Sequence, residues 1–428
     1  MSGELTTAQV ADYLGVKTQT VYAYVSRGVL SPLRREPGTG SVFALQDVQA
    51  LGRGRSGRRT SPRATSEDVR TAVTQVGPGA LAYRGHDVRD LAGAWTFEEV
   101  RDLLVGVRGE TAPAVPMPRA PVDALMAALP RETRVLDRCK HAVLVAGSSD
   151  LGRHDRSPRA FATAGTRSVR AMAVAVGSSL GGRWPREAAE RTREAGDGSG
   201  QAGDGSGEAG DGSGDGALAP VLAAYLGLPV DLLDLALVLL ADHDLAVSTT
   251  AVRVAVSAGA DGYSALLAGL AAADSPVHVG ASVQALDWLR GAVQDPRGAL
   301  AAALAEGPPP GFGHVVYTEV DPRARLLLDR VLPDAGRDLA DTISLLEVEL
   351  AERRGWVLNV DLALAALVLA HDLPRDAGPA IFACARTAGW TAHAIEELAE
   401  PGMRFRLRGV YTGPRRVDRE AAEALRSH

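Results

Sequence analysis

Apolar residues recur every three or four positions along most of this 428-residue chain, which is the spacing of amphipathic helices. The segment 96–104 shows the pattern clearly, because a threonine and an early pair of glutamates precede its apolar face. Similar helices are predicted at 121–129 and 168–180, and the helical pattern is strong from residue 217 onward. Period-2 alternation is limited to two short hairpins, expected within 33–43 and 71–82. The chain is therefore predicted to be mostly α.

The first 52 residues are predicted to fold as a separate unit. Thr6 and Thr7 are expected to cap a first helix that runs to Leu14. After a turn at Gly15, a second helix capped by Thr18 is expected to run to about residue 27. A hairpin wing and a short third helix follow. The spacing of Ala11, Gly15 and Val21 fits a helix-turn-helix, and the whole resembles the small winged helix-turn-helix domains of the MerR and excisionase type.

The charge of this unit is typical of a domain that binds nucleic acid. Residues 1–63 hold nine Lys and Arg against four Asp and Glu, a charge of +5, so the rest of the chain, with a total of −6, carries −11. Residues 53–64 form a basic linker. The asymmetry favours duplex DNA as the partner, and a docking module that does not bind DNA is the alternative. The candidate groove or phosphate contacts are Gln19, Thr20, Tyr22, Tyr24, Arg27, Arg34 and Arg35.

The composition narrows the class of protein. With 46% apolar residues, the chain is long enough for two or more domains with real cores. Its two cysteines imply no disulfide framework and fit a reducing cytosol. Neither a signal peptide nor an apolar run of membrane-spanning length is visible, so the expected location is cytoplasmic with no membrane partner. Residues 194–214 repeat a seven-residue Gly, Asp and Ser unit three times, which predicts a flexible acidic insertion at 194–216.

Three segments carry the candidate chemistry. Residues 311–323 are GFGHVVYTEVDPR, residues 275–281 are SPVHVGA, and residues 358–361 are LNVD. In this order and at about these separations they resemble the citrate synthase family, whose members carry GPLHGGA-like, GFGHRVYK…DPR and NVD segments. The resemblance covers 65–428 and includes further segments at 81–85, 241–243, 383–390 and 411–414.

The resemblance implies a fold, substrates and a partner. It predicts a citrate synthase domain at 65–428 with large and small helical parts, the small subdomain spanning about 279–372. Acetyl-CoA and oxaloacetate would be its substrates, with no cofactor and no metal. It would act as a homodimer or higher homo-oligomer. The residues offer no phosphate-binding loop and no cluster of Cys and His with metal-ligand spacing.

The resemblance also assigns roles to seven residues. Asp361 would take a proton from the acetyl methyl group, His278 would stabilise the enol, and His314 would polarise the ketone of oxaloacetate. The substrate-binding residues would be His243, Arg323, Arg386 and Arg406. In the family, the residue that matches Arg406 reaches into the active site of the other subunit.

Taken alone, several of these residues have simpler explanations. His243 would be a core residue of an apolar helix, and Asp361 could be a helix N-cap. The six other histidines are predicted to have no catalytic role. They are His86, His141, His154, His371, His393 and His428.

Departures from the family pattern leave the acyl substrate open. Val279 stands where the family has Gly, which crowds the acyl pocket, and Val315 and Thr318 stand where it has basic residues, the second of which helps to hold CoA phosphate. A 2-methylcitrate synthase that uses propionyl-CoA is one alternative. A DNA-binding, metabolite-sensing regulator on a citrate synthase scaffold is the other. Further departures stand at Ser275, Leu240 and Leu407.

Overall fold

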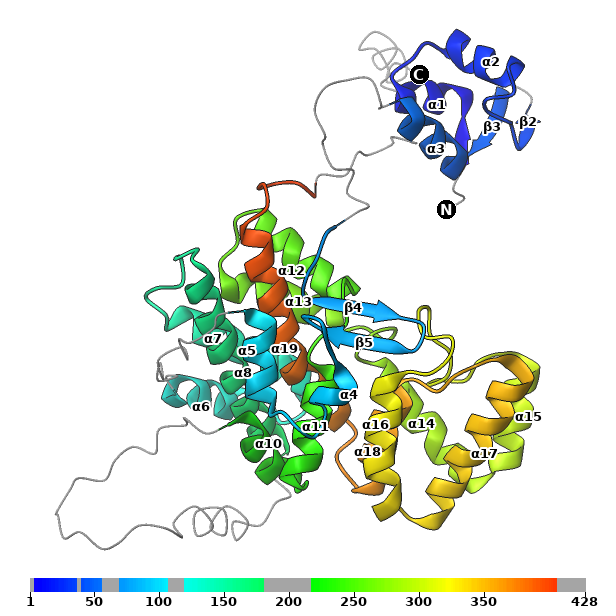
Figure 1. Ribbon diagram of the computed structural model, residues 1–428. Coiled ribbons are helices and arrows are strands. Elements are labelled where there is room, and N and C mark those ends of the chain that lie inside the picture. The colour runs from blue at the N-terminus through cyan, green and yellow to red at the C-terminus, as the bar shows by residue number, and fades with distance from the viewer. Residues whose placement is uncertain (1–3, 37–39, 56–68, 107–118, 181–216, 406–428) are drawn as a thin grey trace, which may run out of the picture. The chain divides into compact units, whose positions relative to one another are not determined.

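The computed structural model describes residues 4–36, 40–55, 69–106, 119–180 and 217–405 (Figure 1). The chain forms two compact units. One comprises Met1–Val69 with Phe405–His428, and the other comprises Arg70–Arg404. The predicted insertion at 194–216, Arg406, Leu407 and the segment 411–414 lie outside the described residues.

The N-terminal unit combines three helices with a small antiparallel sheet. The sheet order is β1-β3-β2, with Arg34 opposite Val42 and Arg35 opposite Ser41 in the wing. The predicted helices and wing are present, and β1 is an additional strand. Val10, Val21 and Phe43 are fully buried in its core. The elements are β1 (Glu4–Thr6), α1 (Thr7–Leu14), α2 (Thr18–Ser26), β2 (Arg34–Glu36), β3 (Gly40–Ala44) and α3 (Leu45–Arg55).

The start of α2 differs from the prediction. Thr18 is the first residue of the helix, and Lys17 occupies the N-cap position with no side-chain hydrogen bond. The cap predicted for α1 is present, since the Thr6 hydroxyl accepts from the Gln9 backbone N–H and the Gln9 side chain accepts from Thr6 N–H. Gly15 takes φ +63°, the left-handed conformation that the turn requires.

The second unit opens with a small sheet and continues as helices. Strands β4 (Thr74–Gly77), β5 (Ala80–Tyr83) and β6 (His86–Asp87) form a meander, of which the sequence predicted only the first hairpin. Helix α5 (Phe97–Val105) begins with the predicted capping box between Thr96 and Glu99. Short helix α4 (Val88–Leu91) precedes it, and α6 (Arg119–Ala128), α7 (Val135–Ser148), α8 (Pro158–Leu180), α10 (Leu218–Leu226), α11 (Val230–Leu240), α12 (Val247–Ser257) and α13 (Gly262–Ala273) follow.

Helix α19 (Ala377–Leu398) is the centre of this helical packing (Figure 1). Nearly every residue along it is buried, as expected of a helix surrounded on all sides by others. Its contact with α8 is so close that a Cβ added to Gly165 would lie 2.3 Å from Thr391 Oγ1. Because this helix carries Arg386, the central packing also fixes a candidate substrate-binding residue.

A second group of helices lies together in Figure 1, drawn in colours from yellow-green through yellow to orange. They fall in the range predicted for a small subdomain, a boundary that stays a prediction. The helices are α14 (Ala281–Gln294), α15 (Pro296–Glu306), α16 (Pro322–Val331), α17 (Arg337–Arg354) and α18 (Val360–Ala370), with the 3-10 turn η3 (Leu332–Asp334) after α16.

Over the described residues, no single helix has both the length and the apolarity needed to cross a bilayer, and the pair α10 and α11, which passes only when joined, is bent by 117°.

Candidate active site

The loop that carries His314 is joined by hydrogen bonds to the segment that leads into α18. Gly313 N–H donates to Val357 O at 2.7 Å, Asn359 N–H donates to Gly311 O at 2.9 Å, and Phe312 and Leu358 form a β-bridge. Gly311 has φ +88°, and a Cβ there would lie 2.7 Å from that of Leu362, so only glycine fits. These contacts bring two predicted catalytic loops, far apart in sequence, into one frame.

The His314 ring has a defined proton position. Its Nδ1 accepts backbone N–H bonds from Val316 at 3.0 Å and Tyr317 at 3.1 Å, so this nitrogen carries no proton. Burial, with the nearby Arg323 cation, lowers the pKa of His314, which keeps the ring neutral. The remaining proton therefore stands on Nε2, and His314 is a neutral hydrogen-bond donor.

Asp361 lies in the first turn of α18. Asn359, not Asp361, is the N-cap, because the Asn359 side chain accepts the Asp361 N–H at 3.0 Å and donates to Gly313 O at 2.9 Å. The simpler explanation of Asp361 as a cap is thus wrong. Burial raises the pKa of Asp361 to about 6, against the lowering effect of the Arg323 cation. A carboxylate with this pKa is a stronger base than an exposed aspartate and still ionises near neutral pH.

Arg323 is buried and already paired. Its Nε and Nη2 donate to the two carboxylate oxygens of Asp321 at 3.0 and 2.8 Å. Asp321, which is fully buried, also accepts the Val360 N–H at 3.0 Å. Asp321 therefore connects the start of α16 to the start of α18, and it holds Arg323 beside Asp361.

His243 lies in the loop after α11 and not within an apolar helix, so the prediction of a helical core histidine is wrong. Its ring stands edge-on to that of His314, with centroids 5.3 Å apart, and its Nε2 lies 3.1 Å from the Tyr317 hydroxyl. Burial lowers the pKa of His243 well below its usual range, and the Arg323 and Arg386 cations lower it further. The ring is therefore neutral, near two guanidinium groups.

Arg386 is a buried cation with a donor to spare. Its Nε donates to Leu240 O at 2.8 Å, while its Nη2 is buried with no hydrogen-bond partner among the described residues. The guanidinium lies over the Phe382 ring, 4.5 Å from the centroid. Burial lowers the pKa of Arg386 to about 10. A buried N–H without a partner is costly unless a ligand accepts from it, and a carboxylate oxygen is the natural acceptor.

His278 is held by α12 and α19. Its Nε2 lies 2.9 Å from the Ser248 hydroxyl, and that hydroxyl accepts the Trp390 indole N–H at 3.2 Å. Because the indole only donates, the Ser248 hydroxyl can donate its proton to Nε2, and in that arrangement the His278 proton stands on Nδ1. Burial lowers the pKa of His278 to about 4, with the Arg386 cation as the second cause. His278 is thus a second neutral donor.

Six of the seven predicted residues therefore share one site within Arg70–Arg404. The charge of Arg386 acts on the pKa of His243, His278 and Asp361 alike, which places the three near one cation. Arg406 lies outside the described residues. Five further residues orient this set, and the sequence analysis did not assign them a role, because a single sequence does not reveal hydrogen bonds between distant side chains. The five orienting residues are Ser248, Tyr317, Asp321, Asn359 and Trp390.

A comparison of the sequence with models of known protein families identifies the family of this chain. Residues 66–408 match the family model for the citrate synthase C-terminal domain. The chain belongs to the citrate synthase family. Residues 4–54 match a helix-turn-helix domain model.

Individual citrate synthases share the sequence and the fold. A citrate synthase of Saccharolobus solfataricus is 32% identical over 43% of this chain and 52% of its own length, and one of Haloferax volcanii is 34% identical over 43% and 51%. The chain thus spans about half the length of these curated relatives. The structure of Thermoplasma acidophilum citrate synthase in ternary complex with carboxymethyl coenzyme A and oxaloacetate has a TM-score of 0.65 at 24% identity, covering 82% of this chain and 95% of that one. That likeness establishes the fold.

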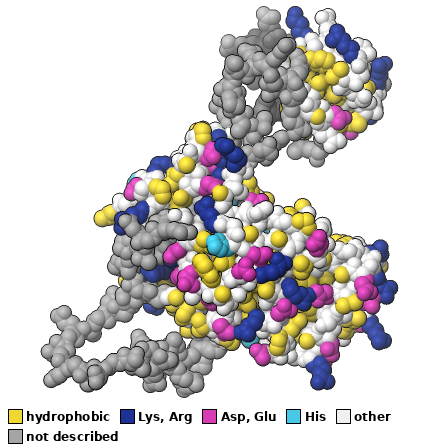
Figure 2. Space-filling view, viewed as in Figure 1, with side chains coloured by type: hydrophobic (Ala, Val, Ile, Leu, Met, Phe, Trp, Pro, Cys, Tyr) yellow, Lys and Arg dark blue, Asp and Glu magenta, His cyan; other side chains and the backbone are white. Residues whose placement is uncertain are grey.

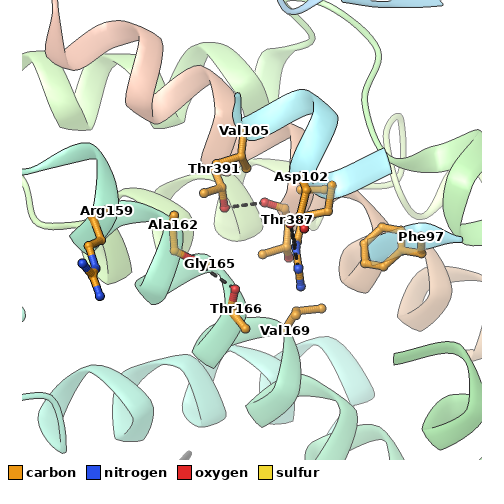
Figure 3. A pocket seen from close by; sticks show the side chains of 12 residues that line it. Phe97, Asp102, Val105, Arg159, Ala162, Gly165, Thr166, Val169, Thr387 and Thr391 are labelled. Carbon is orange, nitrogen blue, oxygen red and sulfur yellow. Dashed lines mark hydrogen bonds and ion pairs between the residues drawn. The ribbon is translucent and has the colours of Figure 1, made fainter. Parts of the chain in front are cut away.

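The citrate synthase unit also has a small cavity away from the histidines (Figure 3). It lies among α5, α8 and α19, has a volume of about 30 Å³, and is lined by Phe97, Thr166 and Thr391 among others. Such a volume holds about a single water molecule and no organic substrate. We regard it as a packing defect.

Across the ranges that the structure describes, no three His, Cys, Asp or Glu side chains are grouped so as to hold a metal ion.

The helix-turn-helix unit presents its candidate contacts on two faces. Gln19, Tyr22 and Arg27 of the α2 region are exposed, and Figure 2 shows Lys and Arg side chains along the rim of this unit. In the wing, Arg34 binds Glu4 with both terminal nitrogens at 2.7 Å. Neighbouring residues of a strand point to opposite faces, so Arg35 points away from this pair. A groove between α2 and the wing is lined by Tyr22, Val25, Ser26, Arg35, Gly40 and Ser41.

Proposed function

We propose that this protein condenses acetyl-CoA with oxaloacetate to give citrate and CoA. The observation that carries the proposal is the frame that holds a base, Asp361, and a neutral donor, His314, on hydrogen-bonded neighbouring segments. An acetyl methyl group is a very weak acid, so its deprotonation needs a basic carboxylate together with donors for the enol and ketone oxygens. The ligands named for the Thermoplasma acidophilum structure, carboxymethyl coenzyme A and oxaloacetate, are consistent with it.

Each residue would have one role. Asp361 takes a proton from the methyl carbon while His278 Nδ1–H donates to the thioester oxygen as it becomes an enol. The enol carbon then attacks the ketone carbon of oxaloacetate, and His314 Nε2–H donates to the ketone oxygen. Arg323 and Arg386 bind the carboxylates, with His243 beside them. Hydrolysis of the citryl-CoA thioester would make the reaction irreversible.

The decisive experiment is a thiol-release assay of the purified protein with oxaloacetate and acetyl-CoA. CoA release that depends on both substrates is the expected result. Absence of release at saturating substrate would overturn the proposal and favour the regulator on a citrate synthase scaffold. Propionyl-CoA in the same assay tests the 2-methylcitrate alternative. Val279, buried beside His278, stands where the family has Gly, so it bears on the size of the acyl group that fits.

We further propose that residues 1–63 bind duplex DNA. The supporting observation is the exposed face of α2 beside the groove that Arg35 lines, on a unit of charge +5. DNA phosphates attract such a surface in a salt-dependent way. A homodimer is also proposed, since the family places the residue matching Arg406 in the partner's site.

A further inference from the structure

Tyr317 occupies the centre of the site although neither its type nor its spacing suggested a role. It follows His314 by three residues, and its side chain is 1% exposed. Its ring lies 4.6 Å from the His314 ring and 5.4 Å from the His243 ring, between centroids, and the Arg323 guanidinium lies over it at 5.2 Å. Tyr317 therefore contacts three of the residues assigned to oxaloacetate.

The Tyr317 hydroxyl can make a hydrogen bond beyond the one that it makes to His243. Among the described residues its hydrogen-bond partner is His243 Nε2, at 3.1 Å. Burial raises the pKa of Tyr317 to about 12, so the hydroxyl stays protonated. When the neutral His243 ring donates its Nε2–H to the hydroxyl oxygen, the hydroxyl proton is available to another acceptor.

The charges around the Tyr317 hydroxyl favour an anion as that acceptor. The Arg323 and Arg386 cations both act on the Tyr317 phenol, and Arg386 Nη2 is buried without a partner. Two buried guanidinium groups and a buried hydroxyl together match a carboxylate, which accepts several short hydrogen bonds at once. A neutral ligand could accept from the spare guanidinium donor but would bring no negative charge to the two buried cations.

We propose that Tyr317 is a substrate-binding residue, whose hydroxyl accepts from His243 and donates to a carboxylate oxygen of the dicarboxylate substrate. The inference rests on the proposed function, because it names oxaloacetate as that substrate. It adds a neutral donor to the arginines, and it makes the position of the His243 ring depend on a residue from the His314 loop. The two loops would then close on the substrate as one hydrogen-bonded unit.

The test is Tyr317→Phe, which removes the hydroxyl and keeps the ring. Oxaloacetate affinity is measured by calorimetry in the absence of acetyl-CoA, and turnover by CoA release. We expect the Kd and the KM for oxaloacetate to rise about tenfold or more, the typical loss for a hydrogen bond to a charged group, with kcat changed less than about threefold. The KM for acetyl-CoA should stay unchanged.

A matched control is Tyr263→Phe. Tyr263 is as buried as Tyr317, and its hydroxyl donates to Asp150 at 2.7 Å, away from the histidines. This variant should keep the wild-type Kd for oxaloacetate even if its melting temperature falls. An unchanged Kd in a folded Tyr317→Phe protein, or equal changes in both variants, would overturn the inference. If the wild-type protein itself bound no oxaloacetate, the proposed function would fail instead, so the two failures are distinguishable.

Discussion

The two units use arginine in opposite ways. In the citrate synthase unit, Arg323 and Arg386 are at most 3% exposed, and each is held by defined hydrogen bonds. Asp321, two residues earlier, binds Arg323, and Leu240 O, from a distant part of the chain, accepts from Arg386. In the N-terminal unit, Arg27 and Arg35 are exposed, with Arg35 at the edge of an open groove. Buried, oriented guanidinium groups suit a small dicarboxylate that is enclosed, whereas exposed ones suit a phosphate backbone that remains in solvent.

The contrast extends to the cost of losing a contact. A buried donor left without its partner keeps its full desolvation penalty, whereas an exposed donor is solvated again by water. Changes in the citrate synthase unit should therefore have large, specific effects on turnover or folding. Changes in the N-terminal unit should have smaller, salt-dependent effects.

The largest expected effect is that of Asp361→Ala. Removing the base should lower kcat by about 10²–10⁴, the usual contribution of general base catalysis. The measurement is CoA release at saturating acetyl-CoA and oxaloacetate, with the Kd for oxaloacetate as the control, which should change little. A loss of less than about tenfold would mean that another group takes the proton.

The next effect separates the two buried arginines. Arg386→Leu removes the spare Nη2 donor and should raise the KM for oxaloacetate about tenfold to a hundredfold. Arg323→Leu should weaken binding too, but it also leaves the fully buried Asp321 unpaired, which typically costs about 3–5 kcal/mol of folding free energy. Urea unfolding of both variants is the measurement. Equal stability losses would contradict the distinction between a paired and a partly free arginine.

A third prediction concerns pH. Since Asp361 must be ionised to act and its pKa is about 6, kcat/KM should rise with pH up to about 6 and then level off. Its folded pKa lies above the usual value of 3.8, so its favourable contribution to folding is present below pH 4 and is lost as pH rises through 6. Asp361→Asn should therefore be more stable than wild type at pH 7.5, and this gain should shrink at pH 5. Denaturant unfolding at the two pH values measures it.

These residues also mark how far the sequence could reach. The helices, both hairpins and the ordered loops of His278, His314 and Asp361 follow from periodicity, turn residues and motifs. The partners of those loops do not. Asp321 meets Val360 and Tyr317 meets His243 only because the folded chain brings distant segments together. His243 was assigned to a helix because its apolar neighbours mask the end of α11 at Leu240. Sequence patterns thus located the reacting groups but could not predict the hydrogen bonds that set their protons.

The smallest expected effect is on the N-terminal unit, where two adjacent arginines provide their own control. Arg35 lines the groove beside α2, whereas both terminal nitrogens of Arg34 bind Glu4. If about four phosphates are neutralised, the slope of log affinity against log salt should be near −3.6 for wild type. Arg35→Ala should weaken binding and reduce the magnitude of the slope by about one, while Arg34→Ala should leave the slope unchanged.

A salt-titrated mobility shift on the full chain and on a variant lacking residues 1–63 completes the comparison. The truncated protein should lose DNA binding and keep its turnover, because all the described catalytic and substrate-binding residues lie beyond residue 240. Equal effects of Arg34→Ala and Arg35→Ala would mean that the Glu4 pair opens on binding and that the two faces of the wing are equivalent. A flat salt response in the full chain would instead identify the unit as a protein-docking module. In that case its exposed α2 face would bind another polypeptide, and the contrast between enclosed and open arginine sites would hold for the citrate synthase unit alone.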